Sequence, residues 1–512
     1  VLETTGNAVI TADTITIAAA QTGQSQDTGN YSMRETTQVK AGIRSGGDLA
    51  VSGRRISILA SDLAADAITL TATDDITLAN QDATHYSRLT DISRGHWGAK
   101  TTKTTTVSAT DTVKSAVSGN TITLSSDALA IQGSDLTSTG DMRLNARDIS
   151  IKNSWDRQQK TIQKSETGSF HASGQDHAAG MASETGVGST LTAGGTLAMT
   201  AQSNLAIQGS DITATILDAQ APEITIHSAQ NTASRYSHKH QHGIGHKKII
   251  KNDALRITQA SSTVLAQDNL RLSGEAIAIA GSNLTATGDM TLAADTVAIT
   301  GTEERDYARS YTLTQSLDSA SMRITDVEQV EASVRYSQQS RDITHDNRTI
   351  TSSTLASGGT LSITATDAIA LTGSDLTATD IALTASDIAI ASAVETTRHQ
   401  ETEEMLALDI GMTLGNAYID SINRVSVLDD ANQQLHQAKK ELDRIQDLYD
   451  AGQSRNSALD MAKANYTLAM ANVAAATASV SKQAARAARS AGTYGLYGEQ
   501  VARTSGSIST YE

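Results

Sequence analysis

Short apolar triplets recur along the first 400 residues, each with large apolar first and third positions and a small or polar middle position. Examples are Ile122-x-Leu124, Leu129-x-Ile131 and Ile149-x-Ile151. Because side chains alternate between the two faces of a strand, each triplet predicts a very short strand with one buried face. The links between triplets are rich in Gly, Asp, Asn and Ser and are too short for a crossover helix.

A six-residue phrase recurs between these triplets. It reads GSDLTS at 133–138, GSDITA from 209, GSNLTA from 281 and GSDLTA from 373. A repeated phrase with matching flanks indicates a repeat array, and stacked short strands favour a right-handed parallel β-helix with roughly 20 residues per coil. Residues 48–79 contain the triplets without the phrase and are interpreted as a degenerate coil. Asp in place of Ile149 or Ile388 should disrupt this stacking.

Polar excursions interrupt the repeats after the last triplet of a module. They are rich in Thr, Ser, Gln, Arg, Lys and His. Insertions at one register map to one face of a solenoid, so we expect long hairpins or loops on a single side, where a partner would bind. They lie near residues 20–45, 80–118, 153–189, 228–263 and 301–354.

The hydrophobic period changes in the C-terminal part. From Leu428 to Tyr449, and again from Leu459 to Val480, apolar residues alternate between three- and four-residue spacings. This spacing predicts an antiparallel α-helical hairpin within residues 401–490, which we expect to cap the open end of the solenoid. Residues 491–512 are expected to form a flexible tail.

Composition narrows the class of protein. The 512 residues include one Pro, no Cys and only 3% aromatic residues, as suits the thin interior of a solenoid rather than a deep globular core. A formal charge of −16 argues against a nucleic-acid partner. No apolar run has the length of a membrane span. The chain opens directly in repeat-like sequence without a secretory signal, so we expect it to be part of a longer protein.

Candidate chemistry is confined to a few side chains. Alternating histidines at His238, His240 and His242, with His246 nearby, could bind a transition metal from one face of a strand. Neighbouring lysines would repel a cation, so the alternative is an exposed basic hairpin tip that touches an anionic partner or senses acid pH. No cofactor is expected. The recurring Asp135, Asp211 and Asp375 belong to the repeat and are explained as turn residues rather than catalytic acids.

Four further side chains are candidates for partner contacts. They are Trp97, Trp155, Lys247 and Lys248. An exposed tryptophan beside arginine can anchor a protein or a sugar. Alternatively, each tryptophan packs over the wall of the solenoid.

The repeats resemble a known family. The phrase GSDLTATDIALTASDIAI from 373 and the return sequences STLTAGGTLAMTA at 189 and STLASGGTLSITA at 353 are similar to the second haemagglutinin repeat region of filamentous-haemagglutinin-type exoproteins. These are two-partner-secretion proteins and include contact-dependent growth inhibition effectors. The resemblance covers roughly residues 1–400. It implies a non-catalytic protein that a dedicated outer-membrane transporter exports to the bacterial surface or medium.

The resemblance leaves two roles open. One is toxin delivery, in which the protein engages the surface or outer membrane of a target cell, and the other is an adhesin or matrix fibre. A helical region after this repeat type favours delivery, because toxin-bearing relatives share that arrangement. A β-helical carbohydrate-active enzyme would need clustered carboxylates and aromatic platforms. A phage tailspike would be an obligate trimer, whereas the helical hairpin suggests a monomer.

Overall fold

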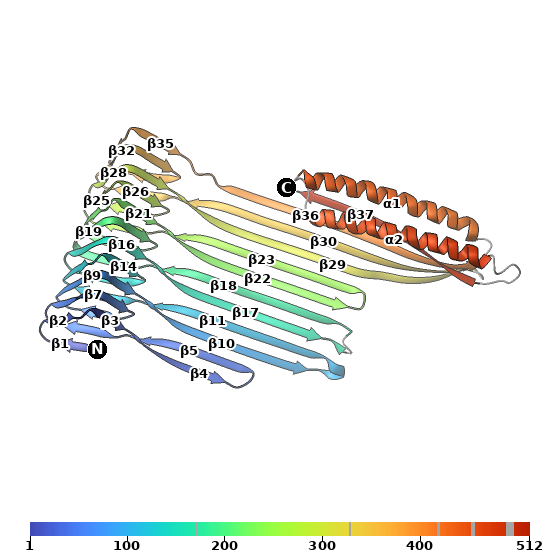
Figure 1. Cartoon of the computed structure of the whole chain (residues 1–512), viewed down its shortest axis with the longest axis horizontal. Helices are drawn as coiled ribbons and strands as arrows, with labels where there is room; N and C mark the ends of the chain where they lie inside the picture. The colour runs from blue at the N-terminus through green and yellow to red at the C-terminus, as the bar shows by residue number, and fades with distance from the viewer. Residues whose placement is uncertain (170–171, 327–328, 417–419, 452–455, 488–495, 512) are drawn as a thin grey trace.

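The molecule is a β-helix from which one broad antiparallel sheet projects, with two long helices beside the last strands of that sheet (Figure 1). Helices α1 (Asp420–Asp450) and α2 (Asn456–Ala487) pack as a hairpin through Ile445, Leu459 and Ala462. The computed structural model describes the backbone of residues 1–169, 172–326, 329–416, 420–451, 456–487 and 496–511.

The β-helix stacks eleven coils among the described residues, with strands arranged in three parallel columns. Stacked residues such as Ile122 and Met142 lie 20 positions apart, which confirms the expected coil length. Its strands are β1 (Leu2–Thr4), β2 (Ala8–Thr11), β3 (Thr14–Ala18), β6 (Gly42–Ser45), β7 (Leu49–Leu59), β8 (Asp62–Ala64), β9 (Ala67–Ala79), β12 (Ser115–Gly119), β13 (Thr121–Ser125), β14 (Ala128–Gln132), β15 (Ser134–Ser138), β16 (Met142–Lys152), β19 (Thr190–Gln208), β20 (Asp211–Gln220), β21 (Glu223–His227), β24 (Thr263–Ala266), β25 (Leu270–Ser273), β26 (Ala276–Ala280), β27 (Asn283–Ala286), β28 (Met290–Thr300), β31 (Ser353–Ser357), β32 (Thr360–Thr372), β33 (Ser374–Thr377), β34 (Asp380–Thr384) and β35 (Asp387–Ala391).

The apolar triplets supply the core. Their first and third residues point inward and form one continuous cluster from Ile15 to Leu371, as the alternation predicts. Ile149, for example, is only 1% exposed. The last coil differs, because no described strand stacks on its outer side. Ile388 is therefore 41% exposed, and the expectation that it is buried like Ile149 is wrong.

Five tight corners occur in alternate coils, and four of them carry the repeated phrase. The glycine that opens each copy has a φ between 49° and 56°, a left-handed conformation that favours glycine. Ala60 takes the same place with a φ of 44°. The sequence ASDLA from Ala60 is therefore the counterpart of the phrase in the coil that was expected to lack it. The five corner residues are Ala60, Gly133, Gly209, Gly281 and Gly373.

Buried serines line the inside of the same edge of the solenoid. The Ser134 hydroxyl donates to the Gln132 carbonyl (2.9 Å), and the Ser189 hydroxyl donates to the Lys152 carbonyl (2.7 Å). These bonds satisfy buried carbonyl groups at the point where the backbone changes direction. The row consists of Ser61, Ser115, Ser134, Ser189, Ser210, Ser262, Ser282 and Ser353.

At the remaining coils, a hairpin replaces the tight corner. Six hairpins leave the solenoid, five of them at the expected polar excursions, and pair edge to edge into one 12-stranded antiparallel sheet (Figure 1). Their strands are β4 (Ala20–Asp27), β5 (Tyr31–Val39), β10 (Gln81–Arg94), β11 (Lys100–Val113), β17 (Ser154–Thr167), β18 (Gly174–Val187), β22 (Ala229–Gly243), β23 (His246–Ala260), β29 (Thr302–Asp326), β30 (Gln329–Thr351), β36 (Thr396–Asn416) and β37 (Leu496–Tyr511).

The C-terminal region departs from the expected boundaries. Residues 401–416 belong to strand β36, and residues 496–511 form β37 rather than a flexible tail. The physical reason is that β30 has an outer edge of unpaired backbone groups, which β36 satisfies and β37 then extends. The helical hairpin connects these two strands and lies beside the sheet, so it does not cap the solenoid (Figure 1).

Aspartate substitutions at two stacked positions separate an interior coil from the exposed one. We expect Ile149→Asp to destabilise the protein by about 4 kcal/mol or more, because it buries an unpaired charge and removes an apolar side chain. Ile388→Asp should cost about 1 kcal/mol or less, since water reaches that side chain. Thermal unfolding followed by circular dichroism compares the two, and equal melting temperatures would contradict the stacking described here.

A corner glycine provides a second test. The Cβ of Gly209→Ala would lie 2.5 Å from the Cβ of Ala229, on a backbone with a φ of 51°. We expect a loss of about 1–2 kcal/mol in the free energy of unfolding. Gly6→Ala is the matched control, because its Cβ meets nothing within 4 Å. Denaturant titration of both variants measures the difference, which should vanish if the corner accepts any residue.

Candidate functional site

The projecting sheet is the candidate site because it is a single layer with both faces accessible. Residues paired across strands share a face, and so do residues two apart on one strand. We call one face the basic face, defined by Lys103, Lys164, His177 and Lys239, and the other the histidine face, defined by Tyr236, His238, His240 and His242.

On the basic face, four cationic or titratable side chains stand directly opposite one another on adjacent strands. Lys103 pairs with Lys164, Lys164 with His177, and His177 with Lys239. Lys164 forms an ion pair with Glu166 at 2.5 Å. The His177 Nε2 lies 3.1 Å from the Ser237 hydroxyl. We call these four residues the cation row: Lys103 on β11, Lys164 on β17, His177 on β18 and Lys239 on β22.

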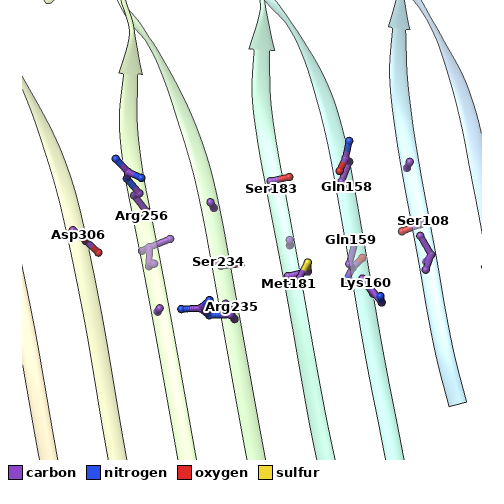
Figure 2. A pocket seen from close by; sticks show the side chains of 16 residues that line it. Ser108, Gln158, Gln159, Lys160, Met181, Ser183, Ser234, Arg235, Arg256 and Asp306 are labelled. Atoms are coloured by element: carbon purple, nitrogen blue, oxygen red, sulfur yellow. The ribbon is translucent and has the colours of Figure 1, made fainter. Parts of the chain in front are cut away.

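A shallow groove of about 600 Å³ lies beside the cation row and crosses strands β11, β17, β18, β22 and β23. Small and apolar residues line it, and Met181 near its centre is 56% exposed. Lys160, Arg235 and Arg256 also line the groove, and Asp306 on β29 lines it opposite Arg256 (Figure 2). By strand parity, Lys160, Met181 and Arg235 share the basic face with the cation row. The groove thus combines an apolar floor with positive charge.

On the histidine face, a ladder of rings covers small residues of the neighbouring strand. The Tyr236 ring lies over Gly180 and the His242 ring over Gly174, where an added Cβ would meet each ring within 2.4–2.6 Å. The Nε2 of His238 lies 2.8 Å from a carboxylate oxygen of Asp253. The ladder therefore packs against the sheet and is partly tied down by a carboxylate.

The four histidines considered as metal ligands do not converge. His238, His240 and His242 share one face as expected, but His246 projects from the basic face, because the adjacent Lys247 pairs with His242. Within the described part of the chain, no three His, Cys, Asp or Glu side chains form a group that could hold a metal. The Nε2 of His240 is buried and has no hydrogen-bond partner among the described residues.

The other candidate residues are dispersed over the sheet. Trp97 lies in a turn at the tip of the β10–β11 hairpin, 72% exposed and with a φ of 60°. Trp155 is half-buried at the base of β17, opposite Gly186. Lys247 projects from the histidine face and Lys248 from the basic face. These side chains do not form one site.

Ion pairs connect strands β29, β30 and β36 in the last two hairpins. Arg335 binds Asp409 and Arg309 binds Asp342, each with a contact of 2.7 Å. Arg305 donates two hydrogen bonds to Asp346, at 2.7 and 2.9 Å. Hydrogen bonding to Arg305 lowers the pKa of Asp346 below its ordinary value. Many arginines and carboxylates in this part of the sheet therefore pair with each other.

Sequence reasoning missed the cation row and the carboxylate that binds His238. Lys103, Lys164 and Lys239 lie in three different excursions, and Asp253 lies outside the histidine segment. The only local signal was the alternation of polar and apolar residues within the excursions, which indicates strands but not which strands pair.

Among the described helices, none is both long and apolar enough to cross a membrane.

A family model described as a hemagglutinin repeat matches residues 96–244 and 330–479, together more than half of the chain. The matched ranges include several coils of the β-helix and also several strands of the projecting sheet. Neither the curated proteins nor the solved structures that were compared with the chain gave a match.

The Arg305–Asp346 pair predicts an acid-sensitive contact between β29 and β30. Because its folded-state pKa is lowered from 3.8, Asp346 contributes stability that is fully present above about pH 4. That contribution is lost as the pH falls through the lowered value. We expect Asp346→Asn to weaken amide protection in β29 and β30 at neutral pH and to reduce its acid dependence, both measured by hydrogen exchange corrected for intrinsic rates.

Asp91→Asn is the matched control, since Asp91 on β10 has no ion-pair partner among the described residues. Its protection profile in β29 and β30 should follow that of the parent at both pH values. An unchanged acid dependence in Asp346→Asn would show that this pair does not stabilise the sheet.

Proposed function

The chain belongs to the hemagglutinin repeat family, and from that premise we propose that it is a non-catalytic segment of a large bacterial exoprotein that delivers a toxin on contact with neighbouring cells. Proteins of this family are secreted or cell-surface proteins of adhesin type. In this proposal the segment gives the exoprotein its reach and presents the surface that touches the target cell, and the toxin follows it in the complete protein.

The observation that carries the proposal is the projecting sheet. Twelve strands present two accessible polar faces, and β29 alone, with 25 residues, extends roughly 80 Å. So large a single-layer surface suits contact with an extended partner better than conversion of a small substrate in a pocket. The target would be the surface or the outer membrane of another cell.

The β-helix supports the proposed export route. Each coil contacts only its neighbours, so the chain can fold coil by coil as it emerges from a narrow transporter. The chain contains no cysteine, and no disulfide has to form during passage. We propose an outer-membrane two-partner-secretion transporter as the export partner and a monomer as the working form.

An adhesin or matrix fibre is the second candidate. The same polar sheet would serve attachment between cells without any toxin. A β-helical carbohydrate-active enzyme receives less support, because 3% aromatic residues provide few sugar-stacking platforms. A phage tailspike also receives less support, because nothing in the described part of the fold calls for three chains.

Excision of one hairpin from the full-length exoprotein tests the proposal. Ala229 and Ala260 are cross-strand partners, so removing residues 229–260 lets the coil close without stretching the chain. In co-culture with unprotected neighbours, we expect killing to fall at least tenfold while the exoprotein still reaches the cell surface. Excision of residues 20–39, the hairpin at the edge of the sheet, is the control and should reduce killing less.

The two candidate functions give different results. Delivery requires that the parent kill neighbours and that excision of 229–260 abolish killing. An adhesin would leave neighbours alive in every co-culture, and excision would reduce only cell–cell aggregation. Full killing by the excised protein would contradict a role of the sheet in delivery.

A further inference from the structure

We infer that the basic face of the projecting sheet binds a phosphate-bearing oligosaccharide of a cell surface, with the cation row and the neighbouring groove as its contact site. The inference deepens the proposed function and rests on it, because it names the chemistry that the sheet would meet on a neighbouring cell. It depends on the register of four strands and on the charges of one face.

The cation row costs free energy in the folded sheet. Like charges directly opposite each other destabilise a sheet, yet Lys103 faces Lys164 across one strand pair. Strands lie about 4.8 Å apart, so the four side chains of the row occupy only about 15 Å. Glu166 forms an ion pair with Lys164, and Asp91 on β10 stands directly opposite Lys103 without an ion pair between them; Lys239 has no ion-pair partner among the described residues. An external anion would remove this repulsion.

The central strands of the basic face carry an excess of positive charge. On strands β11, β17, β18, β22 and β23 seven cations face three acidic side chains, Asp111, Asp156 and Glu166, and the two flanking strands add Asp91 opposite Lys103 and Asp306 opposite Arg256. The cations still outnumber the acids in this region, in a chain whose formal charge is −16. A local positive surface on an acidic protein is a binding surface for polyanions rather than an effect of bulk composition. The cations are Lys103, Lys160, Lys164, Arg235, Lys239, Lys248 and Arg256.

The geometry favours a ligand with several phosphate groups. Lys160 lies four residues from Lys164 on β17, and Arg235 lies four residues from Lys239 on β22, so positive charge extends about 13 Å along the strands as well as across them. A phosphate group carries more than one oxygen acceptor and can bridge two ammonium groups on neighbouring strands. Several phosphates on one ligand would therefore meet several cations at once.

The nature of the side chains favours a saccharide over a nucleic acid. Proteins bind single-stranded nucleic acids by stacking bases on aromatic rings. The basic face of these five strands contains no Phe, Tyr or Trp within the described part of the chain. Its groove instead presents Met181, Val107 and alanines beside Lys160 and Arg235, which suits a sugar ring with one apolar face and charged substituents (Figure 2).

Binding of purified, phosphate-bearing lipopolysaccharide core to the complete chain tests the inference. The row variant is Lys103→Gln with Lys239→Gln. The matched control is Lys247→Gln with Lys251→Gln, which removes the same charge from the histidine face of the same region. At about 0.15 M salt we expect the Kd of the row variant to rise at least tenfold and that of the control to stay within about twofold.

Chemically dephosphorylated core serves as the second probe, and the parent chain should bind it at least tenfold more weakly. Equal loss in the row variant and the control would show that only net charge matters and would overturn the inference. So would equal affinity for the two forms of the core, or tighter binding of single-stranded DNA. Circular dichroism confirms that both variants fold.

The binding assay contains no toxin and no target cell, so its failure differs from failure of the proposed function. If the row variant and its control bind the core equally, or if the parent binds both forms of the core equally, while the exoprotein still kills in co-culture, this inference alone is overturned. Specific binding together with absence of killing would overturn delivery and leave the oligosaccharide site in place on an adhesin.

Discussion

The projecting sheet depends on one geometric match, between the spacing of coils in the solenoid and the spacing of strands in a sheet. Parallel coils and hydrogen-bonded strands are both separated by about 4.8 Å. A hairpin contributes two strands, and hairpins leave the solenoid at every second coil. Consecutive hairpins are therefore offset by two strand widths, and each edge meets the next without a gap.

The alternation of corners enforces that spacing. At one coil the chain turns tightly on a left-handed residue such as Gly209, and at the next coil a hairpin takes its place. Buried serines satisfy the carbonyl groups at both kinds of turn. If two successive coils both carried hairpins, four strands would have to fit where two do, and the continuous sheet would break.

A sheet made in this way has two accessible faces whose side chains need no packing partner. Its side chains can therefore be selected for contact with a partner rather than for stability. The two halves of the sheet differ in this respect. Between β29, β30 and β36, arginines are matched to carboxylates, as in Arg335 with Asp409. On β11 and β17, Lys103 faces Lys164 across the strand pair, which is an arrangement that stability alone would not select.

The sequence alone determined the β-helix, the coil length, the exits of five hairpins and the two helices, because these features follow from local alternation and periodicity. Resemblance in the repeats pointed to the family that the match then established. The tertiary structure decided the pairing between hairpins, the strands at 396–416 and 496–511, and the exposure of Ile388. It also placed Lys103, Lys164, His177 and Lys239 in one row across four strands. Pairing registers between distant segments are set by the stacking of coils, and no local pattern in a polar hairpin encodes its neighbour.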